Sequence, residues 1–462
     1  MATALKEVGI AERIERLPFS RYMTANSFVI SFGTFWDSYM LFSIGSIATH
    51  FLASVNQAQL TARLPLALFL GTFVGAVVFS RLSDKIGRRN AFALDLAILA
   101  LGDLIAVLTS SATLLLIALF IAGLGTGAEL PLSTTYVQEL SPSQRRGRMT
   151  SLQLTFGFLG GTAGGFAALL LVPVTNLPIP GYRVALLIPV IGAIISIIWR
   201  TRLPESPRWL ERVGRADEAD EIMTRIEKAV MKEKGVTSLP PIKSLPPRPM
   251  KQLPTSILFS GRFLRRTISA WSVELFQGFG AYGFTTFVPI VLYSRGYSIV
   301  HALAYTAIIQ IAYPVGTAIS VFVTDRIQRK WGMAAFYLLN TLSGIGFFFV
   351  RTPALVILFG FLTELLIFLD GPLLHAYEAE IYPTPVRAQG AGFSFSLSRL
   401  GGFLAPLAGA AILAAGGKAG DTILIILAAA AWLLCTLISA FVAVNTTGLT
   451  LEDLEGDSSS AT

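Results

Sequence analysis

The sequence predicts an all-α membrane protein in which twelve transmembrane helices form two six-helix repeats. Three observations support this fold class: an apolar composition, a strong asymmetry of positive charge between alternate loops, and an internal repeat. Of the 462 residues, 53% are hydrophobic and 14% are charged, whereas a soluble globular domain carries about 25% charged residues. The chain is therefore expected to lie largely within a lipid bilayer.

Twelve apolar segments are long enough to be transmembrane helices, which need about 20 residues to cross the hydrocarbon core. An even number of crossings places both chain ends on the same side of the membrane. The loops between the helices are short, except the one after the sixth helix. The predicted helices span residues 25–50, 64–82, 91–109, 114–139, 150–172, 184–201, 267–292, 303–324, 333–350, 354–381, 390–415 and 422–444.

Lysine and arginine residues gather on one side of this topology. The N-terminal segment and alternate loops carry thirty of the 36. The opposite loops carry five, and the remaining one, Arg399, lies inside the eleventh helix. Because positive residues are retained on the cytoplasmic side, both termini are predicted to be cytoplasmic. This distribution also accounts for the net charge of +8 without a nucleic-acid partner.

The central loop divides the chain into two bundles. Its first part alternates acidic and basic residues at helical spacing, which indicates a surface helix. Its second part, SLPPIKSLPPRPMKQLP, is typical of a semi-rigid linker. The expected units are a cytoplasmic lead-in, a six-helix bundle, the cytoplasmic loop, a second six-helix bundle and a cytoplasmic tail, at residues 1–24, 25–201, 202–266, 267–444 and 445–462.

Few residues suit covalent or metal chemistry. Cys435 is the single cysteine, so no intrachain disulfide can form. The three histidines, His50, His301 and His375, are far apart in sequence, which argues against a zinc site. The sequence contains no recognisable pairing of a nucleophile with a base. We therefore expect neither an enzyme nor a protein that holds a metal or another cofactor.

A single gapless offset of 241 residues superimposes two pairs of segments. SDKIGRR at 83–89 falls on TDRIQRK at 324–330, and ELPLSTTYVQELSPSQRR at 129–146 falls on DGPLLHAYEAEIYPTPVR at 370–387. Two six-helix halves in parallel repeat, with the substrate near the midplane between them, are an arrangement of secondary transporters. A duplicated scaffold without transport is the alternative.

These segments resemble the major facilitator superfamily over nearly the whole chain. SRLSDKIGRR resembles its loop motif between helices 2 and 3, although Ser80 and Gln328 stand where the family usually or often has glycine. LPESPRWL and TTGLTLEDL resemble the sugar porters. GAELPLSTTYVQELSPSQRRGR, AYGFTTFVP and SRLGGFLAP resemble the metabolite:proton symporters, which carry small organic acids such as nicotinate-like and aromatic carboxylates.

Acidic and basic residues recur together at the predicted cytoplasmic helix ends of both halves. Ion pairs there could latch the two halves in one conformational state. Topology anchoring by positive charge alone is the alternative. The candidate latch residues are Asp84, Arg88, Arg89, Glu139, Arg146, Asp325, Arg329, Glu380 and Arg387.

Three acidic residues inside predicted helices are candidate proton carriers: Asp37, Glu129 and Asp370. At about 1.5 Å per residue, Asp37 lies ~18 Å into the first helix and Glu129 ~15 Å from the cytoplasmic face, with Asp370 at the same depth. Burial disfavours the charged form of a carboxyl group, so such a group can carry a proton near neutral pH. A structural hydrogen bond is the competing interpretation for Glu129 and Asp370.

The resemblance also implies partners for these acids. Sugar porters pair an aspartate in helix 1 with an arginine in helix 4, and Leu119 occupies that arginine position here. This leaves Glu129 as a candidate substitute. Arg399 could bind the carboxylate of a substrate, because its guanidinium matches a carboxylate in shape, or it could pair with Asp37 or Asp370. The other candidate cavity residues are Trp36, Gln153, Gln277, Tyr282, Gln310 and His375.

Taken together, the sequence predicts a monomeric, multi-pass carrier of the cytoplasmic membrane that couples a small organic acid to a proton. Its partners would be the substrate, the proton and the bilayer. A sugar or polyol is the alternative substrate, and a ligand sensor without turnover is the alternative from another class.

Overall fold

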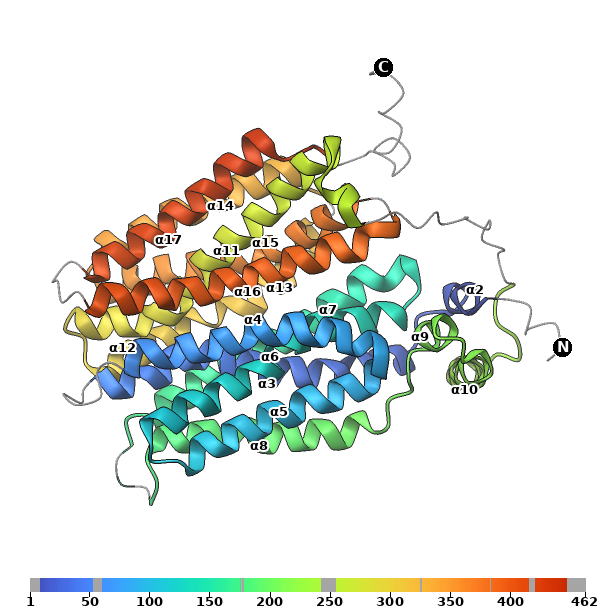
Figure 1. The fold of residues 1–462 in the computed structure, drawn as a ribbon, viewed down its shortest axis with the longest axis horizontal. Helices are drawn as coiled ribbons and strands as arrows, with labels where there is room; N and C mark the ends of the chain where they lie inside the picture. Colours follow the sequence, from blue (N-terminus) through green and yellow to red (C-terminus); the bar gives the residue numbers. More distant parts are fainter. Residues whose placement is uncertain are drawn as a thin grey trace.

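The computed structural model is entirely helical over the residues that it describes, which are 9–446 except 53–59, 175, 177, 242–254, 325, 383 and 415–419. Long helices run side by side, and those before and after the central loop form the two sides of the bundle (Figure 1). Within the described residues, nine segments are long and apolar enough to cross a membrane. The count of twelve crossings stays a prediction.

Each half of the chain supplies helices of similar length and order. The N-terminal half contains α3 (Arg21–Leu52), α4 (Leu60–Ile86), α5 (Arg88–Leu108), α6 (Ala112–Glu139), α7 (Ser143–Leu171) and α8 (Gly181–Arg200). The C-terminal half contains η1 (Thr255–Phe259), α11 (Gly261–Ser294), α12 (Ile299–Ile309), α13 (Ala312–Val323), α14 (Arg329–Phe349), α15 (Pro353–Ile381), α16 (Thr384–Ala414), α17 (Gly420–Leu437) and the π-helical turn η2 (Ile438–Val442).

The span predicted at 303–324 corresponds to one apolar segment, Ile299–Val323, but its helix is interrupted by a short turn. The break lies at Gln310, between α12 and α13. Pro314 has no N–H to donate to the Gln310 carbonyl four residues earlier, and the Thr162 hydroxyl of α7 donates to that carbonyl instead at 2.7 Å. The Gln310 side chain donates to the Phe42 carbonyl of α3 at 2.9 Å. The break therefore provides two hydrogen bonds between the halves.

Both described chain ends lie at the same end of the bundle, which we call the terminal end; the opposite end is the distal end (Figure 1). The halves approach each other closely on the distal side. A Cβ atom added to Gly45 of α3 would lie 2.3 Å from the Thr286 carbonyl oxygen of α11, so only glycine permits this helix contact. At the terminal end, by contrast, a Cβ added to Gly147 near the start of α7 would meet nothing within 4 Å.

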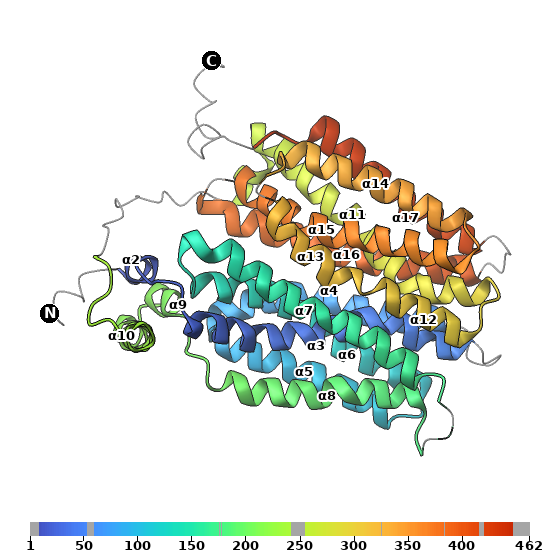
Figure 2. The same ribbon diagram turned by 180° about the vertical axis from the view of Figure 1, so that it is seen from behind.

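Three helices that are not part of the bundle gather beyond its terminal end (Figure 2). They are α2 (Ile10–Glu15), α9 (Pro207–Arg212) and α10 (Ala216–Lys234). Arg13 of α2 is 1% exposed and donates to Glu227 at 2.9 Å and to Asp220. Glu233 of α10 accepts hydrogen bonds from the first backbone N–H groups of α3, at Arg21 and Tyr22. The central loop is thereby attached to the start of the bundle.

Inside the N-terminal half, the Arg200 side chain joins four helices. Its guanidinium makes two hydrogen bonds to the Glu129 carboxylate, at 2.5 and 3.0 Å, and lies 3.7 Å from Asp95. It also donates to the Ile30 and Phe92 carbonyls, at 3.1 and 3.0 Å. Arg200, Glu129 and Asp95 are each at most 2% exposed. We call these three residues the Arg200 cluster.

The backbone of α3 leaves room for this arginine. A Cβ atom added to Gly33 would lie 1.8 Å from the Arg200 guanidinium nitrogen. Position 33 must therefore lack a side chain if Arg200 is to reach Glu129.

Replacing Arg200 by methionine is expected to destabilise the folded protein strongly. Removing one partner of a buried ion pair costs about 3–5 kcal/mol, because the other charge remains buried without compensation. The apparent melting temperature of the purified protein in detergent should fall, and Glu129→Gln added to Arg200→Met should restore part of the loss. Arg225→Met is the control, because Arg225 pairs with Glu221 on the surface. Equal melting temperatures for Arg200→Met and Arg225→Met would contradict this role.

Candidate functional site: a central cavity between the halves

A cavity of about 810 Å³ lies between the two halves, near the middle of the long helices. Helices α3, α6 and α7 line one side, and α11, α15 and α16 line the other. The cavity thus lies where the repeat predicts a substrate site. Its polar lining residues are Asp37, Ser38, Glu274, Gln277, Tyr282, Thr285, His375, Ser398 and Arg399.

The Arg399 guanidinium supplies a positive charge to the cavity wall. It is 1% exposed, and α16 holds it against the C-terminal wall. One guanidinium nitrogen donates to the Tyr282 hydroxyl at 2.7 Å, and the guanidinium carbon lies 5.2 Å from the centre of the Phe395 ring. Its Nε has no hydrogen-bond partner. The side chain is therefore fixed in direction and retains donors for a ligand.

Asp37 lies on the opposite wall. It is 2% exposed, and its Oδ1 has no hydrogen-bond partner. No lysine or arginine of the described residues lies within 4.0 Å of its carboxylate, although Arg399 interacts with it electrostatically across the cavity. An acid and a base thus face one cavity from different halves without forming an ion pair.

Aromatic rings fill much of the remaining cavity wall. The Phe42 and Tyr282 rings are stacked across the halves, with centroids 6.3 Å apart and an interplanar angle of 16°. Phe158 and Phe368 meet edge to face at 4.7 Å, and Phe395 closes the wall near Arg399. Flat apolar surfaces beside one buried guanidinium suit a ligand with a planar apolar body and a negative group.

A second group of charged side chains lies at the C-terminal wall. Nδ1 of His375 is 3.3 Å from Oε2 of Glu378 and 3.7 Å from Oε1 of Glu274. Glu274 belongs to α11, whereas His375 and Glu378 are one turn apart on α15. Glu274 and His375 also line the cavity.

Five of the predicted site residues line the cavity: Asp37, Gln277, Tyr282, His375 and Arg399. Three others point elsewhere. Trp36 packs against Phe32 and Phe35 on its own helix. Gln153 donates to Thr34 and Ser133 inside the N-terminal half. Gln310 lies in the distal contact between the halves.

Two predicted proton carriers also lie outside the cavity lining. Glu129 belongs to the Arg200 cluster, where it is paired with a cation. Asp370 is 1% exposed, and neither of its carboxylate oxygens makes a hydrogen bond with normal geometry; Tyr337 is its neighbour. The repeat thus places the two acids at equivalent positions, but only Glu129 has a counter-charge.

Among the described residues, the latch candidates pair within their own six-helix half or with the N-terminal segment and the central loop. Arg88 lies 3.1 Å from the Glu139 carboxylate, and Arg329 lies 3.2 Å from Glu380, so the repeat reproduces one ion pair in both halves. The remaining contacts are those of Asp84 with Arg88 and Arg212, of Arg146 with Glu15, and of the Arg89 backbone N–H with Glu205. Asp325 and the Arg387 side chain lie outside the described part of the chain.

Several cavity residues are absent from the sequence-based prediction. Helical spacing could have identified Thr285, because it shares one face of α11 with Gln277 and Ala281 at intervals of four residues. Arg200 could not have been identified in this way, because it lies at the predicted end of a membrane helix, where an arginine usually marks only topology.

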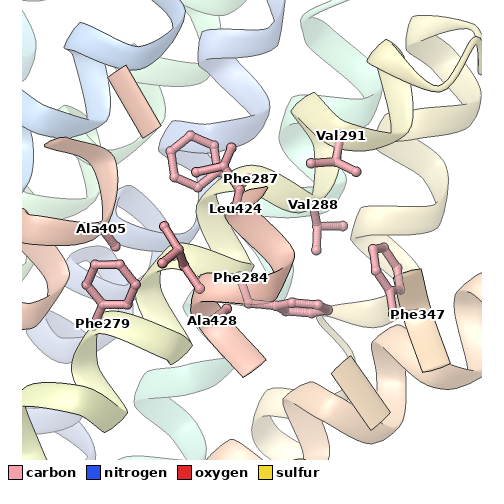
Figure 3. Close-up of a pocket in the computed structure, with 11 residues that line it drawn as sticks. Phe279, Phe284, Phe287, Val288, Val291, Phe347, Ala405, Leu424 and Ala428 are labelled. Carbon is pink, nitrogen blue, oxygen red and sulfur yellow. The ribbon is translucent and has the colours of Figure 1, made fainter. Parts of the chain in front are cut away.

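A second, smaller pocket of about 390 Å³ lies inside the C-terminal half. Figure 3 shows phenylalanine, valine, leucine and alanine side chains pointing into it. All eleven lining residues are apolar, so the pocket offers neither a charge nor a side-chain hydrogen bond to fix a polar ligand. The central cavity, which has both, is therefore the candidate site.

The sequence is similar to those of known transport proteins. The chain is 30% identical to YyaJ of Bacillus subtilis (strain 168), whose name assigns it to metabolite transport without a substrate, over 94% of this chain and 95% of that protein. It is also 30% identical to the niacin transporter NiaP of Acinetobacter baylyi, over 86% of this chain and 89% of that protein.

A solved structure has the same fold. The partially occluded, inward-open xylose transporter XylE of Escherichia coli superimposes with a TM-score of 0.73 at 17% identity, covering 93% of this chain and 100% of that one. XylE is elsewhere described as a proton:xylose symporter.

The family model for sugar (and other) transporters matches residues 25–457. The chain therefore belongs to this family of the major facilitator superfamily, whose members are membrane transporters and not enzymes.

Proposed function

We propose that the protein is a symporter that couples the movement of a small organic acid, a mono- or aromatic carboxylate, to a proton. The observation that carries this proposal is that Asp37 and Arg399 line opposite walls of one cavity without forming an ion pair with each other. Arg399 would bind the carboxylate through its free donors. Asp37 would carry the proton, because its carboxylate has no cation beside it.

The aromatic wall favours a planar substrate. Phe42, Phe158 and Phe368 present ring faces and edges to the cavity, and ring pairs with offset or edge-to-face geometry are attractive. The name of the relative NiaP refers to niacin, an aromatic carboxylic acid. Both observations support an aromatic carboxylate over an aliphatic one.

The remaining parts of the proposal concern topology and motion. The terminal end would be cytoplasmic, because thirty lysines and arginines belong to that side of the predicted topology. Helices α3, α16 and α17 would complete twelve crossings. The halves touch on the distal side and their terminal-end ion pairs lie within each half, so the cavity would open to the cytoplasm in this state. Closure of that end would complete the transport cycle, with the protein acting as a monomer.

A sugar or polyol is the second candidate substrate. Gln277, Thr285 and Ser398 line the cavity and can hydrogen-bond to hydroxyl groups. XylE, which shares the fold, is named for xylose.

An assay of proton entry into proteoliposomes that contain an internal pH dye distinguishes the two candidate substrates. Acidification on addition of benzoate or nicotinate, corrected with empty liposomes for diffusion of the neutral acid, would favour the organic acid. Acidification on addition of a pentose or hexose alone would favour the sugar.

Asp37→Asn is expected to abolish uphill uptake of the carboxylate and to leave exchange between internal and external substrate intact. The amide keeps the shape of the side chain but cannot take up a proton. Asp103→Asn is the matched control, because Asp103 is also a fully buried acid of the N-terminal half but does not line the cavity. Uphill uptake that survives in Asp37→Asn would rule out the proton role of Asp37.

Arg399→Lys is expected to weaken carboxylate binding by about 10- to 100-fold, because hydrogen bonds to charged groups contribute about 1.5–3 kcal/mol and lysine lacks the planar fork. Isothermal titration with benzoate and nicotinate measures this loss. Arg183→Lys, outside the cavity at the start of α8, should bind as the parent does. Unchanged affinity in Arg399→Lys would remove Arg399 from the carboxylate site.

A further inference from the structure

The group formed by Glu274, His375 and Glu378 is compact enough to hold a metal ion. One ligand atom from each residue lies within 4.8 Å of the others. The two glutamates are 2% exposed, whereas 43% of the His375 side chain is exposed. The two carboxylates are therefore buried, whereas the His375 imidazole is open to solvent. We call it the α11–α15 triad.

The triad carries more negative charge than its own side chains neutralise. Oε1 of Glu274 and Oε1 of Glu378 are buried without a hydrogen-bond partner. Among the described residues, His375 is the only basic side chain within 4.0 Å of either carboxylate. Asp370 adds a further negative potential at both Glu274 and His375. Buried carboxylates in such a setting need a cation or a proton.

The internal repeat allows the surroundings of the triad to be compared with the equivalent positions of the N-terminal half. At the offset of 241 residues, Glu274 corresponds to Gly33, Asp370 to Glu129, and Phe441 to Arg200. In the N-terminal half, the Arg200 guanidinium occupies the space beside Gly33 and neutralises Glu129. In the C-terminal half, Phe441 is 72% exposed and supplies no charge, and a glutamate replaces the glycine. At these three positions the C-terminal half therefore has two acids and no arginine, whereas the N-terminal half has one acid and one arginine.

We propose that the α11–α15 triad binds one divalent transition-metal cation of the Zn²⁺ class. Zinc binds imidazole nitrogen and carboxylate oxygen at about 2.0–2.2 Å with tetrahedral geometry, which places neighbouring ligand atoms roughly 3.4 Å apart. The distances of 3.3 and 3.7 Å from Nδ1 of His375 agree with this spacing. Calcium needs six to eight oxygen ligands, so three side chains that include an imidazole favour the softer ion.

Charge and access support the same ion. A Zn²⁺ ion with two carboxylates and a neutral imidazole has no net charge, which removes the cost of burying the two glutamates. The fourth ligand position of the metal would face the cavity that Glu274 and His375 line. The bound ion would join α11 to α15 and stabilise that helix pair.

Zinc titration of the purified full-length protein, treated with chelator and held near neutral pH, tests the proposal without a transport assay. We expect one Zn²⁺ per chain and a higher melting temperature with zinc than without it. Glu378→Gln and His375→Asn should each weaken zinc binding by at least tenfold. Glu364→Gln is the matched control: Glu364 is another buried carboxyl of α15, hydrogen-bonded to Thr285 at 2.7 Å, and its variant should bind zinc as the parent does.

Absence of zinc binding by the folded parent protein would overturn the proposal and would leave the triad as an ion pair of protonated His375. Parent-like zinc binding in both triad variants would overturn it as well, because the ion would then bind elsewhere. If Glu378→Gln lowers the melting temperature of the metal-free protein, His375→Asn decides alone, since its side chain is partly exposed. Neither outcome depends on whether the protein is a proton symporter.

Discussion

The Arg200 cluster is the interaction on which the N-terminal half depends, because helices α3, α5, α6 and α8 converge on one guanidinium. Without that cation, Glu129 and Asp95 would be two charges in a medium where each costs several kcal/mol to bury. The requirement extends to the backbone, since Gly33 must leave room for the arginine. These constraints fix four helices of the half relative to one another.

The C-terminal half has the same helices without this cation, and its charged groups lie at the cavity instead. Glu274, His375 and Arg399 line the cavity, and Asp370 is buried nearby without a counter-charge. Polar groups that lack structural partners are expected where function requires them. The two halves therefore differ at one repeated position: Glu129 is neutralised by Arg200, whereas Asp370 has no such partner among the described residues.

The sequence predicted the helical fold and its repeat because both depend on local quantities, the length of apolar runs and the spacing of motifs. It could not assign helix faces. Trp36 and Asp37 are neighbours in sequence, yet only Asp37 lines the cavity, and Gln310 was expected there but holds the distal contact. The spacing of the histidines argued against a zinc site because it considered histidines alone, whereas the proposed site combines one histidine with carboxylates from two helices. Such pairings depend on how whole helices are rotated, which a single sequence does not determine.

The separation of Asp37 from Arg399 explains how the proposed symporter could couple its two substrates. Closing an empty cavity would bring an aspartate and an arginine together as a pair. Closing a fully loaded cavity would bury a neutral carboxyl group and an arginine–carboxylate pair. With only the proton or only the anion bound, closure would bury one uncompensated charge, at a cost of several kcal/mol. The partly loaded states would therefore rarely close, and the electrostatics of burial alone would enforce symport.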